Sequence, residues 1–174
     1  MAEQDTLNVK VEGSTPSWPT LVIGSSFLVH RRMNKNYELI EHTADIGIRV
    51  KGKELKELLK NAAVAMFDII AEKKPQTANR KPQTARIIVK QKADNLDELF
   101  INWLNELLSL SATKEIIFED FKVNKLEENK LQASVSGSDI KNYKVNTEIK
   151  AATYHQLKIE QINGDWQAEV IFDV

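Results

Sequence analysis

A short polar cluster in the first third of the chain carries residue types that bind metal ions. The stretch EHTAD, residues 41–45, places His42 and Asp45 beside a glutamate. The next residues, IGIRVKG, alternate between apolar and polar side chains, which is typical of a β-strand. A carboxylate and an imidazole at the start of a strand suit a divalent-metal site. The ordinary alternative is a turn in which Asp45 acts as a capping residue.

Two more clusters lie near the C-terminal end of the sequence. The stretch KAATYH, residues 150–155, contains Lys150 and His155, and the final segment IFDV places Asp173 between two apolar residues. Alternation along a strand predicts that Asp173 points away from the face of those neighbours, toward solvent or toward groups that hold it. Taken singly, Lys150 fits an ordinary solvated strand lysine, and His155, like His42, fits a hydrogen-bonded structural histidine.

The composition excludes several kinds of site. The chain has 174 residues and no cysteine, so thiolate metal sites, disulfides and cysteine catalysis are excluded. It also lacks a glycine-rich phosphate loop, a GxSxG motif and an HExxH motif. The net charge of −1 gives no overall attraction to nucleic acid, so an RNA contact would need a local patch. The absence of cysteine suits a reducing compartment, and we expect a cytoplasmic location.

Residues 1–33 differ in character from the rest of the chain. They are rich in serine, threonine, proline and glycine and lack helical periodicity. Their apolar run, LVIGSSFLV, has nine residues, whereas a membrane-spanning helix needs roughly twenty. A basic stretch follows this run instead of preceding it, unlike the order in a secretory signal. We therefore predict a non-core N-terminal appendage over 1–33, a single domain over 34–174 and no membrane partner.

The elements that must position the clusters follow one another after residue 34. Apolar residues spaced three and four apart predict amphipathic helices over 53–72 and 94–113, the second capped by Asp94 and Asp97. The tripeptide NGD at 163–165 predicts a hairpin turn. Alternating segments predict strands over 36–42, 45–52, 86–91, 116–127, 130–137, 144–161 and 166–174. Together these predict an α+β domain whose sheet is mainly antiparallel or mixed, with two principal amphipathic helices packed on it.

Five of these segments, in this order, resemble the archease family. They are YELIEHTADIGIRVKG, LKELLKNAAVAMFDII, LFINWLNELLSL, IKAATYHQLKI and WQAEVIFDV. The resemblance covers residues 37–174 and implies an archease-like fold. It also implies a non-enzymatic protein cofactor that activates an RtcB-type RNA ligase, by promoting its guanylylation and multiple turnover in tRNA splicing and RNA repair. The ligase is then the expected partner, and RNA is reached indirectly through it.

The same resemblance implies which residues form the site. Asp45 and Asp173 match the family's divalent-metal aspartates, and Lys150 matches the lysine of its KAxTYH block. Further candidates for the same partner-facing pocket are His42, Glu106 and His155. Two aspartates offer hard oxygen ligands, which suit Ca²⁺ as the expected ion and Mg²⁺ or Mn²⁺ as alternatives. So few protein ligands require water or a partner's atoms to complete the shell.

Two other functions fit parts of the sequence. A stand-alone metal-dependent phosphoesterase or nuclease would use Asp45, Asp173 and His42, but such enzymes need metals held firmly by several ligands. An RNA-binding or chaperone-like module would use residues 73–92, which hold seven lysines and arginines and no acidic residue. No aromatic residue is interleaved there to stack on bases, which favours a solvated loop instead.

Overall fold

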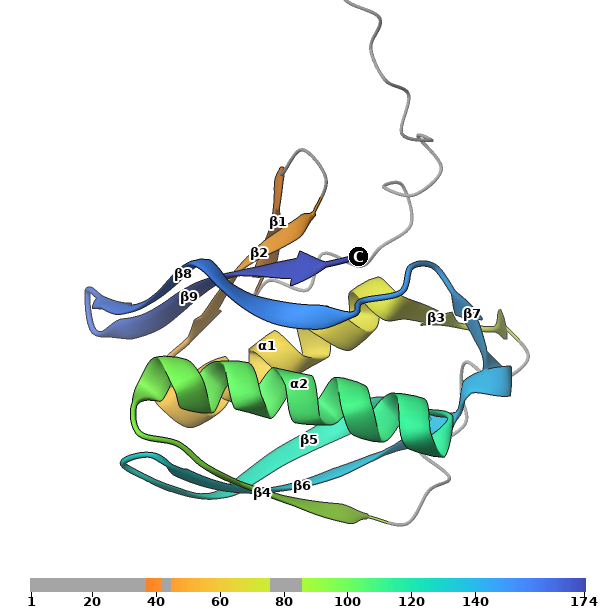
Figure 1. Ribbon diagram of the computed structural model, residues 1–174, viewed down its shortest axis with the longest axis horizontal. Helices are drawn as coiled ribbons and strands as arrows, with labels where there is room; N and C mark the ends of the chain where they lie inside the picture. Colours follow the sequence, from red (N-terminus) through yellow and green to blue (C-terminus); the bar gives the residue numbers. More distant parts are fainter. Residues whose placement is uncertain (1–36, 42–44, 76–85) are drawn as a thin grey trace, which may run out of the picture. The chain divides into compact units, whose positions relative to one another are not determined.

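A computed structural model describes residues 37–41, 45–75 and 86–174 of the chain. Within these residues, two helices lie between a four-stranded and a three-stranded sheet (Figure 1). This confirms the predicted α+β fold, with two amphipathic helices on mainly antiparallel sheets. Residues 1–33 lie outside the described part, so the N-terminal appendage stays a prediction. None of the described helices is long and apolar enough to cross a membrane.

The strands pair antiparallel throughout the described part of the chain. The four-stranded sheet has the order β1 (Tyr37–Glu41), β2 (Ile46–Gly52), β9 (Asp165–Asp173) and β8 (Ala151–Ile162). The three-stranded sheet has the order β4 (Ile87–Lys92), β6 (Lys130–Asp139) and β5 (Ile116–Glu127). A short third sheet pairs β3 (Ala71–Lys73) with β7 (Tyr143–Val145). The single strand predicted over 144–161 is wrong, because β7 and β8 belong to different sheets.

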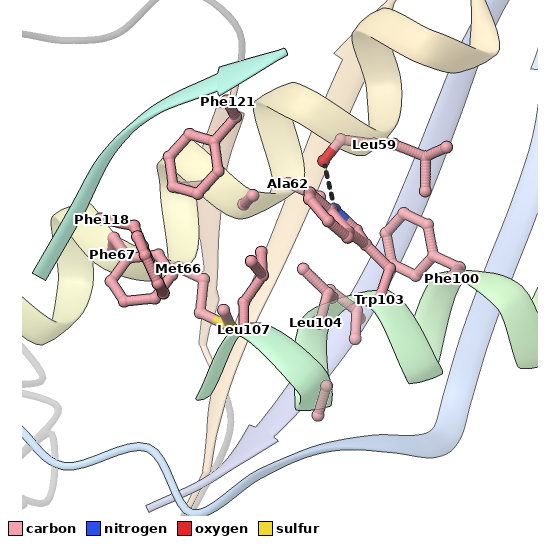
Figure 2. Packing of buried hydrophobic residues seen from close by; sticks show 14 of the residues in the cluster. Leu59, Ala62, Met66, Phe67, Phe100, Trp103, Leu104, Leu107, Phe118 and Phe121 are labelled. Atoms are coloured by element: carbon pink, nitrogen blue, oxygen red, sulfur yellow. Dashed lines mark hydrogen bonds between the residues drawn. The ribbon is translucent and has the colours of Figure 1, made fainter. Parts of the chain in front are cut away.

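Helix α1 (Leu55–Ile70) and helix α2 (Leu96–Lys114) fill the core between the two larger sheets with their apolar faces. The indole of Trp103 on α2 is fully buried, and its Nε1–H donates to the backbone oxygen of Leu59 on α1 at 3.0 Å (Figure 2). This bond satisfies a polar group that burial would otherwise leave without water. Near the C-terminal end of α1, Phe67 packs against two phenylalanines of β5, at ring-centroid distances of 5.5 and 5.7 Å.

The ends of the helices differ in detail from the prediction. The first helix stops at Ile70, two residues early, because the next residues pair with β7 as strand β3. The second helix is capped by Asn95, whose side chain accepts a hydrogen bond from the backbone N–H of Glu98 at 2.9 Å. The Glu98 carboxylate in turn accepts from the backbone N–H of Asp94 at 2.8 Å. The predicted capping pair of Asp94 and Asp97 is therefore wrong by one residue.

Two glycines are required by the chain path. A Cβ on Gly52 would lie 2.4 Å from the backbone nitrogen of Leu58, so only glycine lets the end of β2 approach α1 this closely. Gly164 instead lies in the turn between β8 and β9. There Asn163 and Gly164 have φ angles of 54° and 92°, which are typical of the two central residues of a tight hairpin turn. The predicted NGD turn is confirmed.

A partly buried carboxylate, Glu119 of β5, connects the two smaller sheets. It accepts hydrogen bonds from Lys73 Nζ of β3 at 2.7 Å, from Ser138 Oγ of β6 at 2.8 Å and from the hydroxyl of Tyr143 of β7. Burial alone raises the pKa of Glu119, but these three donors outweigh burial and hold the pKa below its ordinary value. Burial, and then the bond to Glu119, raises the pKa of Tyr143 well above its ordinary value. The cluster thus ties strands of both sheets together.

Candidate functional site

The two candidate metal residues come from the central strands of the four-stranded sheet. Asp45 directly precedes β2 and is half-buried, whereas Asp173 ends β9 and is exposed. The last pair of the β2–β9 ladder joins Ile46 and Phe172. Continuing this antiparallel register by one residue puts Asp45 opposite Asp173. In regular strand geometry, residues in this relation have Cβ atoms about 4.5–5.5 Å apart.

Lys150 lies on the other side of Asp173, directly before β8. Its backbone N–H donates to the Asp173 carbonyl oxygen at 2.8 Å, and its Nζ donates to the backbone oxygen of Val174, also at 2.8 Å. These two bonds hold the ammonium group beside the end of β9. A cation at this position offsets part of the repulsion between two neighbouring carboxylates. The backbone therefore gathers Asp45, Asp173 and Lys150 from three adjacent segments.

An asparagine on α2 fixes the start of β8, and the sequence reasoning did not single it out. Asn105 Oδ1 accepts from the backbone N–H of Ala152 at 2.7 Å, and its Nδ2 donates to the Ala152 carbonyl at 3.1 Å. The Asn105 side-chain amide therefore bonds to the Ala152 backbone as a neighbouring strand would. Ala152 is two positions beyond Lys150. The sequence signal that could have identified Asn105 is its position: a polar residue four positions after buried Ile101, on an otherwise apolar helix face.

The candidate Glu106 adjoins Asn105 in the sequence but does not share its contacts. Glu106 is half-buried on α2. Among the described residues, its carboxylate makes no side-chain hydrogen bond or ion pair, whereas Asn105 makes both bonds to β8. Its part in the pocket stays a prediction.

The candidate His155 lies in an irregular part of β8. The ladder with β9 pairs Thr153 with Ile171 and resumes with Lys158 and Glu169, so residues 154–157 stand opposite one residue of β9. Gln156 within this bulge has a φ of 52°, and His155 beside it is exposed. Because the strand runs away from Asp173 in this direction, His155 lies beyond Thr153, further from the end that carries the aspartates.

The available ligand atoms at the end of β9 are oxygens. Asp45 and Asp173 bring carboxylates, and the adjoining backbone brings carbonyl groups. Within the residues that the structure covers, no group of three or more histidine, cysteine, aspartate or glutamate side chains gathers. The oxygens therefore fit a hard cation such as Ca²⁺, Mg²⁺ or Mn²⁺ only if water or a partner completes the shell. His42 lies outside the described residues, and its role stays a prediction.

Solved structures share this fold. The solution structure of Methanobacterium thermoautotrophicum protein 1598 has a TM-score of 0.68 at 30% identity, covering 80% of this chain and 99% of that one. The crystal structure of an archease from Thermotoga maritima, described as a possible chaperone, has a TM-score of 0.54 at 26% identity. That match covers 79% of this chain and 96% of the Thermotoga chain.

Curated relatives give the same result by sequence. Protein archease from Methanosarcina barkeri is 38% identical over 146 residues, which cover 80% of this chain and 97% of the relative. Protein archease from Pyrococcus abyssi is 36% identical over 146 residues, covering 80% and 99% respectively. The profile of the Archease protein family matches residues 37–174, the whole of the domain described above. The chain therefore belongs to the archease family.

Proposed function

We propose that this archease is a non-enzymatic protein cofactor, which activates an RtcB-type RNA ligase by promoting its guanylylation and multiple turnover. The observation that supports this most is the β2–β9 register, whose continuation by one residue would set Asp45 opposite Asp173, with Lys150 bonded to the end of the same strand. Two carboxylates and one ammonium group at an exposed strand end suit contact with a partner's metal and nucleotide. The expected setting is tRNA splicing or RNA repair in the cytoplasm.

The exposure of the site favours a role on a partner over a reaction in this chain alone. Asp173 and Lys150 are both exposed, and Asp45 is half-buried, so these groups can reach a docked protein. Asp45 and Asp173 would hold a divalent cation, expected to be Ca²⁺, while Lys150 offsets their repulsion when the cation leaves. The bound cation would supply positive charge against phosphate oxygens. A stand-alone phosphoesterase would instead need more ligands than these two aspartates provide.

A ligase assay tests the proposal directly. Purified RtcB-type ligase is incubated with GTP and metal, with and without the archease, and both ligase–GMP formation and the number of RNA joining turnovers are measured. Asp45→Asn and Asp173→Asn should each abolish the stimulation. Asp165→Asn is the matched control, because Asp165 is an exposed aspartate at the opposite end of β9 and should leave stimulation unchanged. Full stimulation by either site variant would show that the assigned residues are wrong.

The description of the Thermotoga relative as a possible chaperone supplies a second candidate function. Aggregation of the heated ligase, followed by light scattering, separates the two. A chaperone suppresses scattering whether or not Asp45 and Asp173 are present, whereas a site-specific activator loses its effect on guanylylation with either variant.

A further inference from the structure

The outer face of the three-stranded sheet is strongly basic. On β6, Leu131, Ala133 and Val135 point into the core, so the alternate residues of this strand point outward. Their cross-strand partners on β4 and β5 share the outer side. The basic residues on this outer side, called the basic face below, are Arg86, Lys90, Lys92, Lys122, Lys125 and Lys130.

The acidic groups on this side are already paired. Asp120 binds Arg86 at 3.0 Å, and Glu127 binds Lys125 at 2.8 Å. The four lysines that are left are exposed and make no ion pair with any described residue, although Lys130 is the cross-strand partner of Glu127. They are Lys90, Lys92, Lys122 and Lys130. The outer side therefore has a net charge of +4, on a chain whose net charge is −1. Charge is segregated here, even though composition suggests a nearly neutral protein.

One pair of these lysines is placed unfavourably. Lys92 and Lys130 are direct cross-strand partners, and like charges placed opposite each other destabilise a sheet. Beside them is a shallow hollow of about 330 Å³, whose charged lining consists of one carboxylate, Glu127, and the four lysines Lys90, Lys92, Lys125 and Lys130. Four lysines against one carboxylate leave the lining of the hollow net positive, which favours a bound polyanion.

We propose that the basic face binds the phosphate backbone of RNA. Lysine ammonium groups bind phosphate oxygens as point charges. No aromatic side chain belongs to the face, so contacts with phosphates are favoured over stacking on bases. The choice of RNA among polyanions rests on the proposed function, because the substrate of an RNA ligase is the polyanion that its activator meets.

The basic face and the candidate metal site lie on opposite sides of the helices. In Figure 1 the sheet of β4, β6 and β5 lies below α1 and α2, and the sheet that contains β9 lies above them. One molecule therefore has room to contact the ligase through Asp45 and Asp173 and RNA through the basic face. Under this arrangement, the activator contacts RNA directly as well as through the ligase.

Direct RNA binding tests the inference without the ligase. A fluorescein-labelled single-stranded RNA is titrated with the full chain, and its anisotropy is followed at 50 and 200 mM salt. Four phosphate contacts on a single strand predict a slope near −3 in log K against log salt, hence an affinity loss of about fifty-fold across this range. The quadruple Lys→Gln variant of Lys90, Lys92, Lys122 and Lys130 should lose most of this salt dependence.

The matched control changes four exposed lysines elsewhere to glutamine, with the same loss of charge. They are Lys53, Lys56, Lys60 and Lys144. The control should bind RNA within about two-fold of the wild type and keep the salt slope. If the quadruple variant fails to fold, the single variants K90Q and K122Q replace it. Each should make the slope of log K against log salt shallower by the amount expected for one phosphate contact.

Four results would overturn the inference. The first three are no RNA binding at 50 mM salt, binding by the quadruple variant equal to that of the wild type, and an equal loss of binding in the control. A fourth is loss of ligase stimulation with RNA affinity unchanged, which would assign the face to an acidic protein surface. Asp45→Asn should keep full RNA affinity, so failure of the ligase proposal is distinguishable from failure of this one.

Discussion

Ile46 pairs with Phe172 at the end of the β2–β9 ladder, and continuing this register by one residue puts Asp45 opposite Asp173. The two carboxylates come from opposite ends of the domain sequence and would repel each other at this position. Like charges directly across a ladder destabilise it, whereas a shared cation turns the same arrangement into a favourable one. The stability of the domain should therefore depend on divalent cations through these two residues.

Removing one of the two aspartates should separate stability from cation binding. Without divalent cations, Asp45→Asn and Asp173→Asn should melt at or slightly above the wild-type temperature, because the repulsion is relieved. With saturating Ca²⁺ the wild type should gain about 2.7 kcal/mol at a hundred times the dissociation constant, and the variants should gain little. Calorimetry with and without Ca²⁺ measures both effects. Outright unfolding of both variants would show that these aspartates hold the fold together.

Lys150→Ala should act in the opposite direction. It removes the ammonium that donates to Val174 and that offsets the charge of Asp45 and Asp173. The cation-free protein should melt a few degrees lower, since about 1 kcal/mol corresponds to roughly 2–4 °C in a domain of this size. Added Ca²⁺ should restore most of the loss. A melting temperature equal to that of the wild type, at low salt and without Ca²⁺, would contradict the charge-balancing role.

Asn105→Ala should destabilise the start of β8. The substitution leaves the N–H and the carbonyl of Ala152 without their partner on α2, at a cost of about 1–3 kcal/mol. Urea denaturation of the cation-free protein measures this loss. Asn102→Ala is the control, because Asn102 is half-buried on the same helix and makes no side-chain hydrogen bond with a described residue. Equal stability of the two variants would exclude a special role for Asn105.

Gly52→Ala should destabilise the junction between β2 and α1. The new methyl group would meet the Leu58 backbone nitrogen at 2.4 Å, and backbone atoms cannot yield as a flexible side chain does. Overpacking of this kind costs about 1–3 kcal/mol. Thermal denaturation alongside the neighbouring exposed variant Lys53→Ala provides the comparison. A neutral effect of Gly52→Ala would mean that the strand end moves away from the helix at little cost.

Acid should weaken the tie between the smaller sheets through Glu119. Its pKa is lowered in the folded protein by Lys73, Tyr143 and Ser138 against the opposing effect of burial. The stability it contributes is therefore present above the unfolded pKa of about 4.3 and is lost as the pH falls through the lower folded pKa. Glu119→Gln should flatten this acid loss when stability is measured from pH 6 to pH 3. An unchanged pH profile in that variant would contradict the assignment.

Much of the fold was predictable because its signals are local. The periodicity of both helices and the NGD turn of residues 163–165 need only a few neighbouring residues. The end of the first helix was missed because residues 71–73 continue a helical pattern. Their pairing with β7, about seventy residues later, decides their structure. The cap of the second helix was missed because Asp94 and Asn95 are both good capping residues, and only backbone geometry selects between them.

The candidate site, too, was only partly predictable from the sequence. No spacing rule joins Asp45 to Asp173, and only the resemblance to archeases linked them before the ladder register was seen. The basic face was hidden for a similar reason. The sequence shows a positive stretch up to Lys92, but Lys122 and Lys130 belong to other strands, and only the order β4–β6–β5 brings them together.

The bulge in β8 has a consequence for self-association. β8 is an edge strand of its sheet, and a regular open edge offers a row of N–H and carbonyl groups on which another chain can add a strand. Residues 154–157 interrupt that row, and Lys158 and Glu160 place charges just beyond the interruption. A second copy of the sheet cannot align with such an edge over more than a few residues. The irregular segment therefore makes the β8 edge a poor template for an added strand, while the end of β9 stays open to a partner.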